Sequence, residues 1–101
     1  MPEYAVSGAA GSDLRGIVRY TTLHWSAEQA ARYAAGLREC FRMLALSPGM
    51  GRACDSVSLG LRRFEHGKHV VFYRIVAGGI LIVRVLHQRM LPAPSRFDAL
   101  G

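Results

Sequence analysis

The hydrophobic pattern of this 101-residue chain changes its period once, and this change constrains the fold more than any other feature. Up to residue 46, apolar side chains recur every three or four positions, which is typical of amphipathic helices. After residue 60 they form short runs rich in Val, Ile, Phe and Tyr, which are typical of strands. A predicted loop at residues 49–59 separates the two parts. The pattern therefore predicts a helical region followed by a sheet region.

Two helices are expected before this loop. Ser12 follows two glycines and can cap a first helix that ends near Leu23. The second helix has a stronger start signal, because Ser26 is followed three residues later by Gln29, the spacing of a capping box. Its apolar stripe continues to Leu46, and a proline two residues later ends it.

Four strands complete the prediction. A short strand at residues 4–7 opens the chain, and three more are expected at residues 61–66, 69–76 and 80–87, joined by glycine-containing links typical of hairpins. The order strand, helix, helix and three strands predicts an α+β domain with the helix hairpin packed on one face of an antiparallel sheet. No further helical segment is available for the opposite face, so we expect that face to be the working surface.

The length fits a single domain, residues 1–101, with a core at about 3–90 and a tail at 91–101 that two prolines keep out of the sheet. The longest apolar run has nine residues, 75–83, whereas a membrane-spanning helix needs roughly 20. The amino-terminal sequence lacks the features of an export signal. We therefore expect a cytoplasmic protein without a membrane segment.

Charge is unevenly distributed along the chain. Thirteen basic residues against seven acidic ones give a net charge of +6, and residues 57–101 carry +5 of it. Such an excess favours an acidic protein or a polyanion as partner. A plain nucleic-acid-binding module is the competing interpretation. The chain has neither an aromatic strand motif nor a basic recognition helix, so no sequence-specific nucleic-acid binding is expected.

The cysteines do not form a disulfide or metal framework, since no Cys-x-x-Cys motif occurs. Cys40 falls on the apolar stripe of the second helix and is expected in the core. Cys54 could in principle share a metal with His66 and His69, but two histidines three residues apart across a predicted turn are a weak signal. We expect no metal and no cofactor.

Four segments carry a family resemblance: LRRF at residues 61–64, HVVFYRI at 69–75, VRVLHQRM at 83–90, and an L-x-x-x-P-x-x-G-R link at 44–52. Their order and spacing resemble the ParE branch of the RelE/ParE toxins over nearly the whole chain. The resemblance implies a RelE/ParE-like fold and a toxin of a type II toxin-antitoxin system, of the kind that stabilises plasmids and inhibits growth. It also implies a ParD-like antitoxin that forms a hetero-oligomer with the toxin. We expect acidic residues and apolar anchors in the antitoxin segment that docks on or beside the sheet and helix pair.

The two branches of this superfamily differ in activity. ParE members poison DNA gyrase and block replication, whereas RelE members cleave messenger RNA in the ribosome. Lys68 is the only lysine, and residues 70–72 are apolar where the RelE branch places a catalytic arginine. These residues favour a gyrase inhibitor that is not an enzyme and has no catalytic residues. His87, with Arg84 and Arg89, keeps a RelE-like ribosome-dependent endoribonuclease as the alternative.

The candidate target-binding surface combines basic residues of the last strands and the tail with two apolar anchors. Consecutive strand residues point to opposite faces, so only one of Arg62 and Arg63 can lie on the face that the helices leave open. A two-residue turn at Gly78-Gly79 would send Arg74 and Arg84 to opposite faces, whereas a three-residue loop would put both on one face. The candidate residues are Arg62, Arg63, Arg84, His87, Arg89, Met90 and Leu91.

Overall fold

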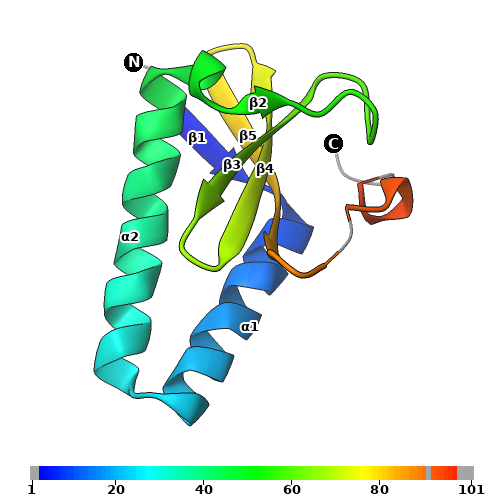
Figure 1. Ribbon diagram of the computed structural model, residues 1–101. Coiled ribbons are helices and arrows are strands. Elements are labelled where there is room, and N and C mark those ends of the chain that lie inside the picture. Colours follow the sequence, from blue (N-terminus) through cyan, green and yellow to red (C-terminus); the bar gives the residue numbers. More distant parts are fainter. Residues whose placement is uncertain (1–2, 91, 98–101) are drawn as a thin grey trace.

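The computed structural model describes residues 3–90 and 92–97 (Figure 1). Leu91, one of the candidate target-binding residues, lies outside the described residues. The elements follow the predicted order, with one short strand added. They are β1 (Glu3–Val6), α1 (Gly8–His24), α2 (Ala27–Leu46), β2 (Arg52–Ala53), β3 (Leu61–His66), β4 (His69–Val76) and β5 (Gly79–His87).

Helix α1 begins earlier than the sequence predicts. Its N-cap is Ser7, whose hydroxyl oxygen accepts a hydrogen bond from the amide of Ala10 at 3.0 Å, so the prediction of Ser12 as the cap was wrong. Glycine costs a helix roughly 1 kcal/mol relative to alanine, and a serine cap contributes a similar amount. A helix can therefore start across Gly8 and Gly11 once Ser7 caps it.

Helix α2 has the predicted start and end. The hydroxyl of Ser26 accepts a hydrogen bond from the amide of Gln29 at 3.0 Å, and the helix ends at Leu46. The apolar stripe of α2 packs both on the sheet and on α1. Among the described residues, neither helix is long and apolar enough to cross a membrane.

The sheet is mixed rather than antiparallel. Its strand order is β1-β5-β4-β3-β2, with antiparallel neighbours from β2 to β5 and a parallel pair of β1 and β5. Tight hairpins force antiparallel neighbours, whereas the long connection between β1 and β5 allows a parallel pair. Strand β2 lies in the predicted loop and adds two residues to the outer edge of β3.

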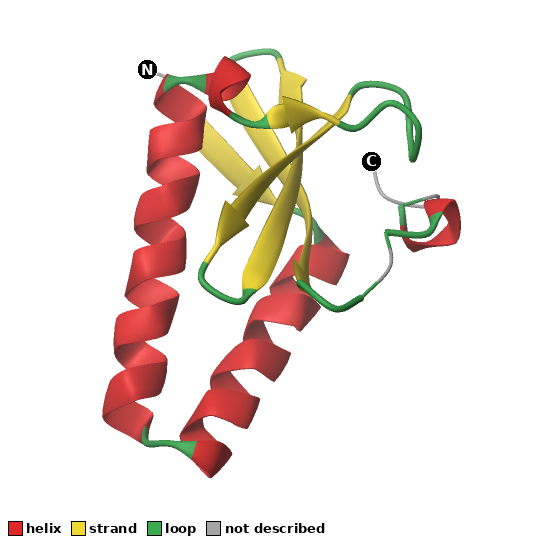
Figure 2. Cartoon of the chain, viewed as in Figure 1, coloured by secondary structure: helices red, strands yellow, loops and turns green. Residues whose placement is uncertain are grey.

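The helix hairpin covers one face of the sheet (Figure 2). Tyr73 lies in this core, fully buried, and its hydroxyl donates to the carbonyl of Pro48 at 2.6 Å and accepts from the amide of Gly51 at 2.9 Å. A Cβ atom at position 51 would lie 2.8 Å from the carbonyl oxygen of Arg63. The glycine of the L-x-x-x-P-x-x-G-R link is therefore required by the close approach of the chain to β3 and β4.

The opposite face carries a second core, so the expectation that it lies uncovered was wrong. The cover is not helical. It consists of the segment between β2 and β3 and of Phe97, which follows a short turn at Pro94–Arg96, is 3% exposed and packs on Phe72 with ring centroids 5.0 Å apart. The buried members of this cluster are Cys54, Leu61, Val70, Phe72, Val83, Leu86 and Phe97.

A β-bulge settles the register that the sequence left open. The turn between β4 and β5 has two residues, Ala77 and Gly78, because Val76 pairs with Gly79. Farther along, Tyr73 pairs with Ile82 but Phe72 pairs with Arg84, so β5 gains one residue. This shift puts Arg84 on the same face of the sheet as its partner Phe72 and as Arg74, the face opposite the helices.

Candidate functional site

A groove of about 1100 Å³ opens between the helix hairpin and the ends of β4 and β5. Helix α1 forms one wall with Asp13, Ile17 and Tyr20, and the end of β5 forms the other. The floor is made by α2 and by the β3–β4 turn, where Gly67 has a φ of +57° that favours glycine. The remaining lining residues are Ser12, Gly16, Thr21, Trp25, Gln29, Arg32, Tyr33, Lys68, His69, Arg84, Val85, Leu86, His87 and Met90.

Exposed aromatic side chains stand at the tip of the helix hairpin, at one end of the groove. Tyr20 is 60% exposed and stacks on His24 with centroids 4.0 Å apart, and Trp25 is 66% exposed. Large aromatic groups with a polar atom are common anchors of protein interfaces. Neither residue was among the predicted site residues. They could have been found as large apolar residues that fall off the α1 stripe of Leu14 and Ile17.

Three histidines gather on the helix side of the sheet. The hydroxyl of Tyr33 lies 2.6 Å from Nδ1 of His69, and the rings of His69 and His87 are 5.5 Å apart. Burial, together with the neighbouring His87 and His66, lowers the pKa of His69 to about 4. Burial also raises the pKa of Tyr33. At neutral pH, His69 is therefore uncharged, and its Nδ1 shares a hydrogen bond with the Tyr33 hydroxyl, which also lies 3.3 Å from the carbonyl oxygen of His66.

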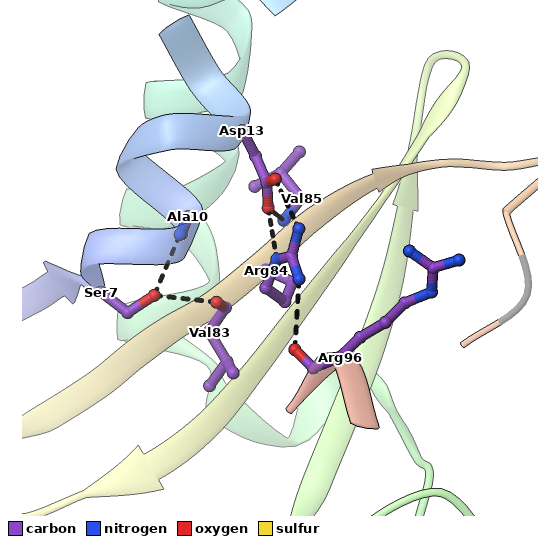
Figure 3. A network of polar contacts seen from close by, with 7 residues as sticks. All are labelled: Ser7, Ala10, Asp13, Val83, Arg84, Val85 and Arg96. Carbon is purple, nitrogen blue, oxygen red and sulfur yellow. Dashed lines mark hydrogen bonds and ion pairs between the residues drawn. The ribbon is translucent and has the colours of Figure 1, made fainter. Parts of the chain in front are cut away.

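Arg84 forms a two-pronged ion pair with Asp13 of α1 (Figure 3). Its Nε and Nη2 donate to the two carboxylate oxygens at 2.8 Å each, and the backbone amide of Val85 donates to the same carboxylate at 2.9 Å. The third nitrogen, Nη1, donates to the carbonyl of Arg96 at 3.2 Å. The hydrogen bonds to Asp13 raise the pKa of Arg84. The guanidinium is thus permanently charged and committed to partners within the chain.

The two arginines of β3 point to opposite faces, as predicted. Arg62 lies on the helix side, where it donates to the carbonyl of Gly51 at 2.6 Å. Arg63 lies on the other side, 5.6 Å from the ring centroid of Phe72 and 3.0 Å from the carboxylate of Glu65. Neither arginine lines the groove.

The candidate target-binding residues therefore divide into groups. Arg84, His87 and Met90 line the groove, and Met90 is 39% exposed. Arg89 is exposed just beyond β5, and its amide donates to Nδ1 of His87 at 3.1 Å. Sequence reasoning grouped residues that are close along the chain, but the sheet separates the β3 pair from the end of β5.

The weakly indicated metal set does not come together. Cys54 belongs to the cluster on the face opposite the helices, whereas His66 and His69 lie beside Tyr33 of α2. Within residues 3–90 and 92–97, no group of three or more His, Cys, Asp or Glu side chains could hold a metal ion.

Comparisons with known proteins cover nearly the whole chain. The family described as "ParE toxin of type II toxin-antitoxin system, parDE" matches residues 4–92. Toxin ParE1 of Caulobacter vibrioides is 44% identical over 89% of this chain and 93% of its own length. Toxin ParE1 of Mycobacterium tuberculosis is 40% identical over 86% and 90%, and Toxin ParE of Escherichia coli is 37% identical over 89% and 88%.

A solved structure has the same fold. The chromosomal ParDE TA system from P. aeruginosa contains a chain that superposes with a TM-score of 0.73, covering 86% of this chain and 96% of that one at 20% identity. At this identity the likeness concerns the fold alone.

Proposed function

The chain belongs to the ParE toxin family of type II toxin-antitoxin systems, and from this premise we propose that it inhibits DNA gyrase in the cytoplasm, without chemistry of its own, until a ParD-like antitoxin neutralises it. A poison of this kind needs only a surface that binds one state of its target better than the others. The proposal has three parts: the absence of catalysis, the antitoxin site and the target-binding surface.

The ion pair between Arg84 and Asp13 is the main support for the proposal that the toxin is not an enzyme. Cleavage of RNA needs a base, an acid and cations that stabilise the phosphate charge as it develops. Two guanidinium nitrogens of Arg84 donate hydrogen bonds to Asp13. Residues 70–72, where a catalytic arginine would be needed, are apolar and at most 4% exposed. His69 is uncharged and bonded to Tyr33. These features argue against a ribonuclease at the end of β5.

The groove has the character expected of an antitoxin site. Apolar and aromatic groups line it, Lys68 adds positive charge, and Arg32 contributes a guanidinium that is paired with Glu28. An amphipathic segment with apolar anchors and acidic residues complements such a surface. We assign the groove, with Tyr20 and Trp25 as its anchors, to the antitoxin.

The segment after β5 is assigned to the target. Arg89 and Met90 are exposed there, and Leu91 follows in the sequence. Arg62, Arg63 and Arg84 have partners within the chain, so we expect them to support the surface rather than to contact gyrase directly.

A supercoiling assay with purified gyrase tests the proposal. We expect the toxin to inhibit supercoiling with accumulation of cleaved plasmid, and the antitoxin to reverse the effect. Replacing Arg89, Met90 and Leu91 together by alanine should lower inhibition, whereas Arg38→Ala on the exposed side of α2 should not. Unchanged supercoiling at saturating toxin would rule out the gyrase target. Codon-specific messenger RNA cleavage that is lost in His87→Ala would favour a RelE-like ribonuclease instead.

A further inference from the structure

Strand β5 changes neighbours halfway along its length. Its first residues pair with β1, but β1 ends at Val6, opposite Ile82. Beyond that point α1 borders the strand through side chains. The hydroxyl of Ser7 donates to the carbonyl of Val83 at 2.8 Å, and the carboxylate of Asp13 accepts from the amide of Val85 at 2.9 Å. On this edge of β5, where a neighbouring strand would otherwise pair, the side chains of Ser7 and Asp13 form hydrogen bonds with the backbone carbonyl of Val83 and the backbone amide of Val85.

The bulge turns Arg84 toward this edge. Val83, the extra residue, is buried in the cluster opposite the helices, and Arg84 follows it with a side chain that is 19% exposed. Its guanidinium reaches Asp13 on the groove wall with two nitrogens and the carbonyl of Arg96 with the third (Figure 3). One side chain therefore connects the α1 start to the carboxy-terminal segment.

Phe97 and the backbone of Arg96 both hold the carboxy-terminal segment, residues 92–97, against the body. The ring of Phe97 packs on Phe72, a contact that tolerates sliding because apolar packing has little directionality. The hydrogen bond from Arg84 to the carbonyl of Arg96 is directional and charge-assisted, so it fixes one orientation of the segment. Asp13 fixes the orientation of the planar guanidinium, because it accepts hydrogen bonds from Nε and Nη2. The third nitrogen, Nη1, then points at the carbonyl of Arg96.

We propose that Arg84 is the positioning residue of the carboxy-terminal segment, residues 92–97, aligned by Asp13, and that by holding this segment it keeps Arg89 and Met90 presented to the protein target. The link to the target rests on the proposed function. The positioning itself does not depend on the identity of the target. Asp13 and Arg84 thus support target binding by positioning the segment, without contacting the target themselves.

Hydrogen exchange of the full chain tests the positioning directly. The amides of Arg96 and Phe97 donate to the carbonyls of Ala93 and Pro94 at 3.0 Å each, so their exchange reports whether the segment is ordered. We expect Arg84→Met to speed their exchange by roughly ten-fold, because local opening of a fastened segment becomes easier. Arg84→Lys keeps the charge but replaces the fork with a single ammonium, so we expect nearly the same increase. Asp13→Asn should give a smaller one.

Controls separate local loosening from loss of the fold. Glu39→Gln breaks another carboxylate–arginine pair, on the exposed side of α2, and should leave the exchange of Arg96 and Phe97 unchanged. Amides of α2 and β4 should stay protected in every variant. If Arg84→Met unfolds the chain, Arg84→Lys gives the answer. Wild-type exchange of the segment in Arg84→Lys would overturn the proposal, because charge alone would then suffice.

Gyrase inhibition tests the functional half separately. We expect Arg84→Lys and Asp13→Asn to inhibit supercoiling less well than Glu39→Gln, in proportion to the increase in exchange. Faster exchange with undiminished inhibition would overturn the link to the target. If the wild-type chain does not inhibit gyrase, the proposed function fails, and the exchange measurement still decides whether Arg84 positions the segment.

Discussion

The two faces of the sheet carry aromatic pairs of nearly the same geometry but of different origin. On the helix side, the rings of Tyr4 and Phe41 are 5.3 Å apart at 63°, and on the other side those of Phe72 and Phe97 are 5.0 Å apart at 62°. Phe41 lies within a 20-residue helix, more than a turn from its end, whereas Phe97 follows a single short turn near the end of the chain. Equal contacts do not imply equal stability, because the segments that supply them differ in how easily they open.

The largest difference between the faces should appear in unfolding. Phe41→Ala should lower the free energy of unfolding by about 3–5 kcal/mol, since α2 cannot move to close the cavity. Phe97→Ala should cost only about 1–2 kcal/mol, because a terminal segment can shift or detach locally. Urea denaturation measures both. An equal loss would mean that the carboxy-terminal segment is as integral to the fold as α2.

The groove and the segment after β5 should separate in binding experiments. Trp25→Ala should weaken antitoxin binding by about 10- to 100-fold, as expected for loss of an exposed aromatic anchor, with little effect on gyrase inhibition. Alanine at Arg89, Met90 and Leu91 should do the reverse. Titration calorimetry and the supercoiling assay measure the two effects. If both variants impair both activities equally, the two surfaces act as one.

A pH titration should distinguish the helix side through the half-buried His69. The pKa of His69 is lowered from 6.5 to about 4, so the unfolded chain takes up a proton there before the folded chain does. His69 therefore costs no stability above about pH 6.5, and stability falls as the pH decreases toward 4. The partly exposed ring should account for a loss of roughly 1–2 kcal/mol. His69→Asn should remove this part of the pH dependence, whereas His24→Asn should leave it intact.

The smallest effect is expected on the face opposite the helices, at its ion pairs. Glu65 accepts from Arg52 at 2.8 Å and lies 3.0 Å from Arg63, but it is about half exposed. Glu65→Gln should cost no more than about 1 kcal/mol, and less at high salt. Denaturation at low and high salt checks this. A loss above that of Phe97→Ala would show that charge, rather than the apolar contact, secures this face.

Local patterns were sufficient for the elements whose signals lie within a few residues. Helix α2, with Ser26 as its cap, and strands β3 and β4 have the predicted bounds because capping and hairpin chemistry are local. The start of α1 was predicted too late, because Gly8 and Gly11 indicated the end of the first strand, whereas Ser7 caps a helix that includes both glycines. The parallel pairing of β1 joins residues far apart along the chain, and no local pattern encodes it.

The candidate site was predicted less completely than the fold. Of the residues predicted to bind the target, Arg84, His87 and Met90 line the groove, and whether they bind a target stays a prediction. The groove itself could not be predicted, because its walls come from α1, α2 and β5. Arg84 and its partner Asp13 lie 71 positions apart, so no local pattern connects them.

The position of Trp25 makes the groove visible to spectroscopy. It is the single tryptophan of the chain, and it lines the groove with 66% of its surface exposed. Indole emission shifts to shorter wavelengths when the ring leaves water, and no second indole in the chain dilutes that signal. Any tryptophan-free segment that covers this wall can therefore be titrated against the unlabelled toxin, and its arrival can be timed by stopped flow.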